Sequence, residues 1–329
     1  MKALITGGAG FIGSHLSAHL LSLGHQVVII DDLSTGRLEN IAPLRDDPRF
    51  QFAIDAITNE VVMDRLASEC DIIFHLAAAV GVELIVRSPV RTIETNIMGT
   101  AAVLRVANRY RRKVLLTSTS EIYGKSNQVP FAEDDDRVLG PTTRSRWSYS
   151  TSKAVDEFLF LGYHRERGLP VVIVRLFNTI GPRQSGRYGM VVPRFVAQAL
   201  AGQPLTVYGD GSQSRCFADV RDVVQGIVAL AQWPAAEGQV FNLGSNREIT
   251  ITDLARLVLA VTGSQSPITT IPYAQAYEAG FEDMMRRVPA LSKVAAWIGW
   301  QVKIPLEETL RAVAQHLTAG AGAPNTPQL

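Results

Sequence analysis

The first half of the chain alternates short, β-branched hydrophobic runs with longer stretches in which hydrophobic residues recur at helical spacing. The runs that predict strands are Lys2–Thr6, Gln26–Ile30, Phe50–Ile54, Asp71–His75 and Lys113–Thr117. The stretches that predict helices are Phe11–Leu23 and Val86–Tyr110. The strand runs are nearly continuous in hydrophobic residues, which is typical of strands buried on both faces. Strands and helices in alternation predict an α/β fold with a doubly wound parallel Rossmann sheet.

The pattern changes after Ser118. A polar loop over residues 124–146 precedes a predicted helix at Tyr149–Glu166 and a buried strand at Val171–Leu176. The later predicted elements are shorter: helices near Val192–Ala201, Val220–Ala231, Ile251–Val261 and Leu306–Leu317, and strands near Leu205–Tyr208 and Val240–Asn242. We therefore expect a Rossmann domain over residues 1–178, a strand near 239–243 that returns to it, a smaller α/β lobe over 179–317 and a disordered tail over 318–329.

Composition narrows the class of protein. The chain has 329 residues, of which 47% are hydrophobic, and its 32 basic residues nearly balance 31 acidic ones. A chain so close to neutral gives no reason to expect a nucleic acid or an anionic membrane as partner. Cys70 and Cys216 lack the spacing of a disulfide framework or a metal site, so we expect no metal. The sequence shows no signal peptide and no apolar run near ~20 residues, which predicts a cytoplasmic protein.

A glycine-rich loop follows the first predicted strand and leads straight into a helix. In Gly7-Gly8-Ala9-Gly10-Phe11-Ile12-Gly13, the first glycine of the spaced set permits a tight turn. Gly10 lets the backbone approach a pyrophosphate, and Gly13 allows close helix packing. Asp31 and Asp32 end the second strand, where a carboxylate accepts hydrogen bonds from ribose hydroxyls and repels a 2′-phosphate. The sequence therefore predicts a site for NAD rather than NADP.

Tyr149 and Lys153 lie four residues apart on one predicted helix, so their side chains share a face. An ammonium group beside a phenol, together with the positive nicotinamide ring of the cofactor, stabilises the phenolate and lowers the pKa of the tyrosine. Tyr149 is then able to take a hydroxyl proton while hydride passes to NAD. Thr119 and Glu121 follow the Lys113–Thr117 strand, at the end of a central strand where ligands meet a doubly wound sheet.

The GxxGxxG spacing and the Tyr149–Lys153 pair resemble the extended short-chain dehydrogenase/reductases, the NAD-dependent epimerase/dehydratase family. The resemblance runs from Met1 to about Leu317 and implies that Thr119 shares the sugar oxygen with Tyr149. It also implies a homodimer built on the helices that match Val86–Tyr110 and Tyr149–Glu166. The further cofactor contacts that it implies are Phe11, Ile12, Asp55, Ala56, Leu76, Ala77, Ala78 and Asn96.

The same resemblance assigns residues to a nucleotide sugar. Asn178 and Arg183, in the stretch Asn178-Thr-Ile-Gly-Pro-Arg183, match the segment that receives the sugar diphosphate. Arg215 and Arg287 match its pyrophosphate-binding arginines, a task that suits the planar, bidentate guanidinium group. Val192 and Tyr208 match positions beside the nucleotide base.

Within this family the chain is most similar to UDP-glucuronic acid decarboxylases. Three stretches carry the likeness: residues 118–124 (STSEIYG), 146–153 (RWSYSTSK) and 280–289 (GFEDMMRRVP). It implies that Ser120, Glu121 and Arg287 handle the substrate carboxylate and the C5 proton. The implied reaction oxidises C4 of UDP-glucuronate and then removes carbon dioxide, giving UDP-xylose or the UDP-4-keto-pentose.

Two other reactions of the family stay open, because residues 79–86 do not resemble the substrate loop of either standard decarboxylase group. A 4-epimerase needs the same oxidation and returns hydride to the other face of the sugar, although Glu121 argues against it. A 4,6-dehydratase would use Glu121 to remove the C5 proton. A protein that only senses the cofactor need not keep Thr119, Tyr149 and Lys153 together, so we expect an enzyme.

Overall fold

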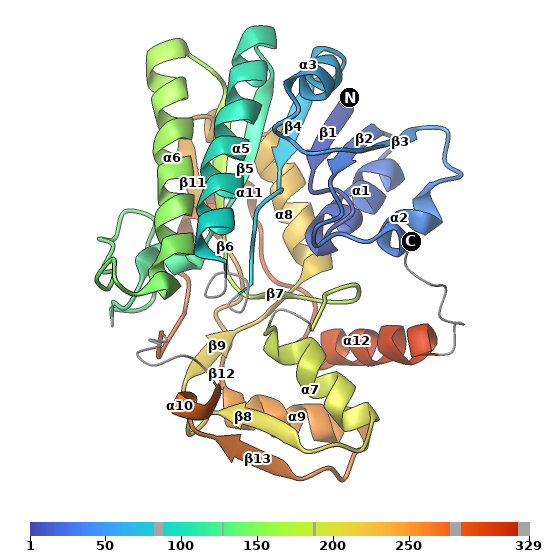
Figure 1. Ribbon diagram of the computed structural model, residues 1–329, viewed down its shortest axis with the longest axis vertical. Helices are drawn as coiled ribbons and strands as arrows, with labels where there is room; N and C mark the ends of the chain where they lie inside the picture. Colours follow the sequence, from blue (N-terminus) through green and yellow to red (C-terminus); the bar gives the residue numbers. More distant parts are fainter. Residues whose placement is uncertain (82–87, 127, 187–188, 277–283, 322–329) are drawn as a thin grey trace.

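The computed structural model describes residues 1–81, 88–126, 128–186, 189–276 and 284–321. Seven strands form its central sheet, and every neighbouring pair is parallel (Figure 1). From one edge to the other they are β11 (Gln239–Leu243), β6 (Val171–Leu176), β5 (Lys113–Thr119), β4 (Ile72–His75), β1 (Lys2–Thr6), β2 (Gln26–Asp31) and β3 (Phe50–Ile54). The winding changes direction between β1 and β4, and ligands of such sheets bind beyond the carboxyl ends of the strands at this point. The predicted fold class is confirmed.

Helices cover both faces of the sheet. One face packs against α3 (Glu60–Ser68), α5 (Pro89–Tyr110) and α6 (Ser148–Arg167). The other packs against α1 (Phe11–Ser22), α8 (Val220–Gln232) and α11 (Ser292–Ile298), with α2 (Leu38–Ile41) near its β2 side. β11, α8 and α11 all come from the second half of the chain. The sheet lobe therefore contains two later helices in addition to the predicted returning strand.

A smaller lobe lies beyond the carboxyl ends of the strands (Figure 1). Its core packs α7 (Val191–Leu200), α9 (Ile251–Thr262) and α12 (Leu306–Ala321) against β8 (Leu205–Tyr208), which pairs in parallel with β13 (Ile268–Ile271). Short strand pairs join the lobes: β7 (Thr179–Ile180) with β10 (Ala218–Asp219), and β9 (Ser214–Cys216) with β12 (Glu248–Thr250). A four-residue helix, α10 (Tyr273–Ala276), follows β13.

Most predicted element bounds lie within one or two residues of the observed ones, and three differences matter. The strand predicted to end at Thr117 continues to Thr119, so Thr119 belongs to β5. The helix predicted from Val86 begins at Pro89, a residue suited to a first helical turn, and Val86 lies outside the described residues. The helix predicted to end at Leu317 continues to Ala321, so residues 318–321 are helical and not disordered, and residues 322–329 lie outside the described part.

Several short elements were not predicted: α3, α11, β13 and the two-stranded pairs between the lobes. Within the described residues, no helix is long and apolar enough to cross a membrane.

Candidate active site

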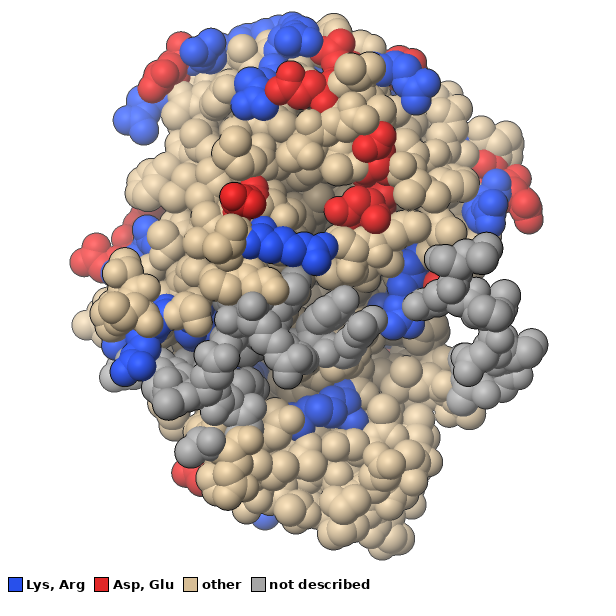
Figure 2. Space-filling view, in the orientation of Figure 1, with Lys and Arg blue, Asp and Glu red and all other residues tan. Residues whose placement is uncertain are grey.

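A cavity of about 360 Å³ opens between the carboxyl ends of the central strands and the smaller lobe. Figure 2 shows that the surface is hollowed between the two lobes and that basic side chains gather along this band. The predicted site residues that line the cavity are Phe11, Ile12, Leu76, Ala78, Thr119, Ser120, Glu121, Tyr149, Asn178, Val192, Tyr208, Arg215 and Arg287. The predicted residues outside its lining are Gly7, Gly10, Gly13, Asp31, Asp32, Asp55, Ala56, Ala77, Asn96, Lys153 and Arg183.

The glycine loop is packed so tightly that three of its residues, Gly7, Gly8 and Gly13, have no room for a side chain. Gly7 has a φ of +71°, and a Cβ there would lie 2.9 Å from the backbone nitrogen of Ala77. A Cβ on Gly13 would lie 2.2 Å from the carbonyl oxygen of Gly7. A Cβ on Gly10 would meet only that same oxygen, at 3.1 Å. The loop therefore closes against the sheet and leaves open space at Gly10, the predicted approach to a pyrophosphate.

The two acidic residues at the end of β2 differ in position. Asp31 is buried beside the glycine loop, where its carboxylate accepts hydrogen bonds from the backbone nitrogens of Ala9 at 2.9 Å and Leu33 at 2.8 Å. Burial raises the pKa of Asp31, and these two hydrogen bonds oppose that effect. Asp32 is exposed and accepts a hydrogen bond from the nitrogen of Ser34. Asp31 is therefore the acid that borders the predicted dinucleotide.

Two other predicted cofactor residues have partners within the protein. The buried Asn96 accepts a hydrogen bond from the nitrogen of Ala79 at 2.8 Å and donates one to Ser152 at 3.0 Å. It thereby ties the segment after β4 to α6. Asp55 accepts hydrogen bonds from the nitrogen of Ala56 at 2.8 Å and from the side chain of Asn59 at 2.9 Å.

Tyr149 and Lys153 share a face of α6, and each has further charged groups near it. Burial raises the pKa of Tyr149, the charge of Glu121 raises it further, and a hydrogen bond with Thr119 opposes both. Lys153 is buried and its Nζ lies 3.0 Å from Oδ2 of the equally buried Asp156. Burial and the surrounding carboxylates therefore raise the pKa of Tyr149, and its lowering by Lys153 together with the nicotinamide ring stays a prediction.

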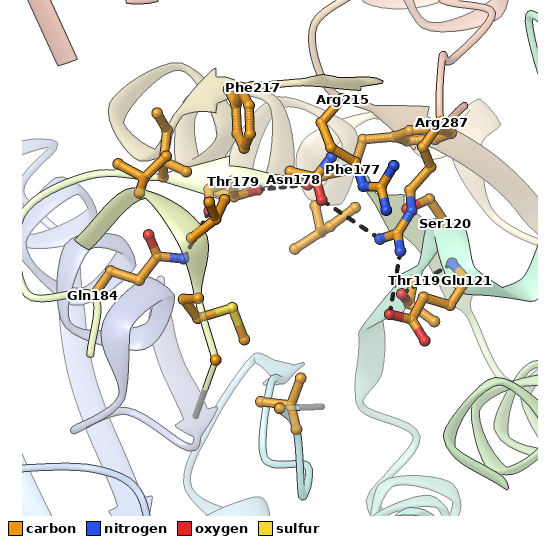
Figure 3. A pocket seen from close by; sticks show the side chains of 18 of the residues that line it. Thr119, Ser120, Glu121, Phe177, Asn178, Thr179, Gln184, Arg215, Phe217 and Arg287 are labelled. Atoms are coloured by element: carbon orange, nitrogen blue, oxygen red, sulfur yellow. Dashed lines mark hydrogen bonds and ion pairs between the residues drawn. The ribbon is translucent and has the colours of Figure 1, made fainter. Parts of the chain in front are cut away.

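Glu121 lies at the centre of the charged part of the cavity, in the 3₁₀ turn Ser120–Tyr123. Oε2 of its carboxylate pairs with Arg146, and Oε1 lies 3.4 Å from Nη2 of Arg287. Figure 3 shows Arg287 reaching toward both Glu121 and Asn178. Burial alone would raise the pKa of Glu121, but the charges of Arg146 and Arg287 outweigh burial and lower it to about 2. The side chain is therefore a carboxylate at neutral pH.

Most of the predicted nucleotide-sugar residues line the same cavity: Asn178, Val192, Tyr208, Arg215 and Arg287. Arg215 lies beside Arg287 (Figure 3) and donates to the carbonyl oxygen of Met284 at 2.7 Å. The ring of Tyr208 lies under the guanidinium group of Arg194, 4.1 Å from ring centroid to guanidinium carbon. Arg183, in contrast, is not brought to the cavity.

Sequence reasoning gave no role to three residues that shape the site: Arg146, Asp156 and Arg194. Arg146 stands three positions before Tyr149 in a stretch that was singled out, which was the available signal. Its partner Glu121 lies 25 positions earlier in the chain, so only the fold reveals the pair. Asp156 is three positions after Lys153, a spacing that indicates a helical ion pair.

A glycine loop that opens a helix and a buried tyrosine–lysine helix meet at one cavity. This arrangement defines the class of the protein as an extended short-chain dehydrogenase/reductase. A family model described as GDP-mannose 4,6 dehydratase matches residues 4–313 of the sequence. The chain belongs to this family of nucleotide-sugar enzymes, as its sequence predicted.

Known proteins agree with this assignment along nearly the whole chain. UDP-N-acetyl-alpha-D-glucosaminuronate decarboxylase from Bacillus cytotoxicus is 40% identical over 95% of this chain and 97% of its own length. UDP-glucuronic acid decarboxylase 1 from Arabidopsis thaliana is 39% identical over 94% of this chain and 68% of its own length. The crystal structure of UDP-glucuronic acid 4-epimerase from Bacillus cereus, in complex with UDP-glucuronic acid and NAD, superposes with a TM-score of 0.87 and 29% identity, covering 97% of this chain and 99% of that one. The predicted likeness to UDP-glucuronic acid decarboxylases is confirmed.

Proposed function

We propose that the protein is an NAD-dependent decarboxylase of a UDP-hexuronate, which oxidises C4 of UDP-glucuronate or its N-acetylamino counterpart and removes C6 as carbon dioxide. The observation that carries the proposal is the position of Glu121, between Arg146 and Arg287 in the cavity that Tyr149 lines. The names of the two similar decarboxylases point to acidic UDP-sugars as substrates.

The charge of the cavity supports an acidic sugar. Its described lining holds one carboxylate, that of Glu121, and four guanidinium groups, those of Arg146, Arg194, Arg215 and Arg287. A buried excess of positive charge is costly unless a ligand neutralises it. A diphosphate together with a sugar carboxylate supplies the negative charge that neutralises this excess, whereas the diphosphate of a neutral sugar supplies less negative charge.

The residues of the sheet lobe fit NAD. The loop from Gly7 to Gly13 leaves space at Gly10 for a pyrophosphate at the N-terminus of α1, and Asp31 presents a buried carboxylate beside the loop for the ribose hydroxyls. Phe11, Ile12, Leu76 and Ala78 line the adjoining part of the cavity. When bound, NAD supplies the oxidising power by accepting a hydride from C4 of the sugar.

The side chains of the protein carry the proton chemistry. Tyr149 takes the proton of the 4-hydroxyl group, and its hydrogen bond with Thr119 stabilises the phenolate that this step requires. Oxidation at C4 gives a β-keto acid, so the electrons of the C5–C6 bond pass into the C4 carbonyl as carbon dioxide leaves. Tyr149 and Thr119 are placed to stabilise the resulting enolate oxygen. The enolate then takes up a proton at C5 from a water molecule, and Glu121, as a carboxylate, orients that water by accepting a hydrogen bond from it.

The test is to incubate the pure protein with NAD and UDP-glucuronate, and in parallel with UDP-N-acetylglucosaminuronate, and to follow both by mass spectrometry and proton NMR. We expect one of them to lose the mass of carbon dioxide and to give a pentose signature. The proportion of UDP-pentose to UDP-4-keto-pentose with NADH then shows whether hydride returns to the sugar. Recovery of both substrates unchanged would contradict the proposal.

A second candidate is 4-epimerisation of UDP-glucuronate, because the Bacillus cereus 4-epimerase shares the fold at a TM-score of 0.87. In the same assay it would leave the mass unchanged and produce a new anomeric signal. The 4,6-dehydration that the family description names would instead release water from C6, and no contact in the described site favours it over decarboxylation.

Three further proposals concern the whole molecule. Residues 1–178, with β11, α8 and α11, hold the cofactor, and the smaller lobe within residues 179–317 supplies most of the nucleotide contacts. A homodimer forms through α5 and α6, which lie side by side (Figure 1) and expose Val90, Met98 and Phe158 at 67%, 59% and 67% of their surface. The cytoplasmic location stays a prediction from the sequence.

A further inference from the structure

Glu121 shares its carboxylate between two arginines that come from different parts of the fold. Arg146 makes the shorter contact, to Oε2. Arg287 lies 3.4 Å from Oε1 of Glu121 and 3.5 Å from Oδ1 of Asn178, so these two contacts are at the long end of the hydrogen-bond range. Arg146 is therefore the tighter partner of Glu121, and the contact of Glu121 with Arg287 is the weaker of the two.

Arg146 is held in place by the structure around it. It belongs to the 3₁₀ turn Ser145–Trp147, directly before α6, and only 3% of its side chain is exposed. Its guanidinium group lies 5.5 Å from the centroid of the Trp147 ring, which is buried in a cluster beneath the cavity. Ser150 of α6 donates a hydrogen bond of 2.7 Å to the carbonyl oxygen of Glu121. The start of α6 thus fixes both ends of this contact, the backbone of Glu121 and the guanidinium group of Arg146.

An acidic ligand changes this balance. Arg287 lines the cavity, and a phosphate or carboxylate is a stronger partner for it than a carboxylate oxygen at 3.4 Å. We propose that Arg146 is a positioning residue that keeps Glu121 ionised and aimed at the reacting sugar while Arg287 binds the acidic group of the substrate. The role in turnover rests on the proposed function, whereas the effect on Glu121 itself does not.

The charged and titratable groups around Glu121 set the direction of the effect. Arg146 lies directly before α6, and Tyr149 lies on α6. Arg215 lies on β9, and Arg287 lies in the segment that precedes α11. Burial opposes ionisation of Glu121, and Arg146 gives the largest of the opposing charge effects. If Arg287 turns to the substrate, Arg146 is the close cation that remains, so without it burial prevails and the carboxyl takes up a proton.

The direct test is infrared spectroscopy of the full-length protein across pH, with ¹³C-labelled glutamate and the Glu121→Gln variant to identify the band of this carboxyl group. In the wild type we expect Glu121 to stay ionised throughout the range in which the protein is folded. In Arg146→Met the titration should move upward by about 1 to 3 pH units, as expected for the loss of an adjacent opposite charge. Arg146→Lys should restore ionisation, and Arg287→Met should shift the titration less than Arg146→Met. An unshifted band in Arg146→Met, or a larger shift in Arg287→Met, would overturn the proposal.

Turnover provides a second readout and separates two kinds of failure. The dependence of kcat/KM on pH, measured with the acidic UDP-sugar that the enzyme converts, should gain a rise on the acid side in Arg146→Met that Arg146→Lys lacks. Arg175→Met is the matched control, because Arg175 also forms a buried pair with a glutamate, Glu157, outside the cavity lining. It should lower the amount of folded enzyme without moving the pH profile. If no acidic UDP-sugar reacts with the wild type, the proposed function fails, and the infrared titration still decides the role of Arg146. If Arg146→Met does not fold, Arg146→Gln replaces it.

Discussion

The buried ion pair between Lys153 and Asp156 gives a prediction about two properties of one variant, its stability and the pH dependence of its activity. The pair is fully enclosed, with 2% of the Lys153 side chain and none of the Asp156 side chain exposed, and its two charged atoms are 3.0 Å apart. Asp156→Asn keeps the shape of the side chain and leaves a buried ammonium group without its counter-ion. Breaking a buried pair in this way costs about 3–5 kcal/mol.

The expected change in melting temperature follows from the size of the chain. An unfolding entropy of about 2.1 cal/mol/K per residue, applied to 329 residues, is about 0.7 kcal/mol/K. The lost stability then lowers Tm by about 4–7 °C. The control is Arg256→Ala, which removes a partner at the same i,i+3 spacing from a pair with side chains 67% and 53% exposed. That change should lower Tm by less than about 1.5 °C, since exposed pairs contribute about 0–1 kcal/mol.

The same substitution should move the rise of activity with pH to lower pH. The charge of Asp156 is one of the causes that raise the pKa of Tyr149. Because Tyr149 must be ionised to take the sugar proton, activity rises with pH through its pKa, and a lower pKa moves that rise to lower pH. Differential scanning calorimetry and the pH dependence of kcat measure the two effects. If Asp156→Asn melts within 1 °C of the wild type, or if its activity rises at higher pH, the reasoning from the buried pair is refuted.

Three other changes test the site. Glu121→Gln removes the charge that, after burial, does most to raise the pKa of Tyr149, so the rise of kcat with pH should move to lower pH even if turnover slows. Gly13→Ala places a Cβ 2.2 Å from a backbone oxygen and should abolish NAD binding in a fluorescence titration, whereas Gly162→Ala on α6, which meets no atom within 4 Å, should bind NAD normally. Arg194→Met removes the cation from the ring of Tyr208 and should raise KM for the UDP-sugar roughly 2- to 30-fold with little change in kcat, as a contact of about 0.5–2 kcal/mol predicts; a loss confined to kcat would contradict this role.

Local patterns in the sequence predicted the elements that hold the site, because strong strand or helix periodicity is recognisable from a short stretch of residues. The glycine loop before α1 is such a case, since Gly7 and Gly13 are required by contacts inside the loop and with the end of β4. The short strand pairs between the lobes were missed, because two or three residues carry no period and their partners are distant in the chain. Helix α3 was missed for a related reason, as its nine residues give little room for a repeat.

The ionisation of the site was the part that the sequence could not predict. The spacing of Tyr149 and Lys153 was read as a pair that lowers the pKa of the tyrosine, but burial and two carboxylates act in the opposite direction. One of these carboxylates, Asp156, is near in sequence, and the other, Glu121, comes from β5's end and is itself held by arginines from two further segments. Charges assembled from such distant positions are a property of the fold, and a local motif does not contain them.

The order of strands in the central sheet has a consequence for biosynthesis. The outer edge of β6 is covered by β11, yet about 60 residues separate Leu176 from Gln239. At about 5–20 residues per second, a ribosome needs roughly 3–12 s to make that stretch. During this interval the nascent sheet ends in a strand of five hydrophobic residues and Arg175, with an unpaired backbone edge able to pair with another chain. Yield of the protein in cells should therefore depend on how quickly translation passes residues 177–243, and on chaperones that shield this edge until β11 emerges.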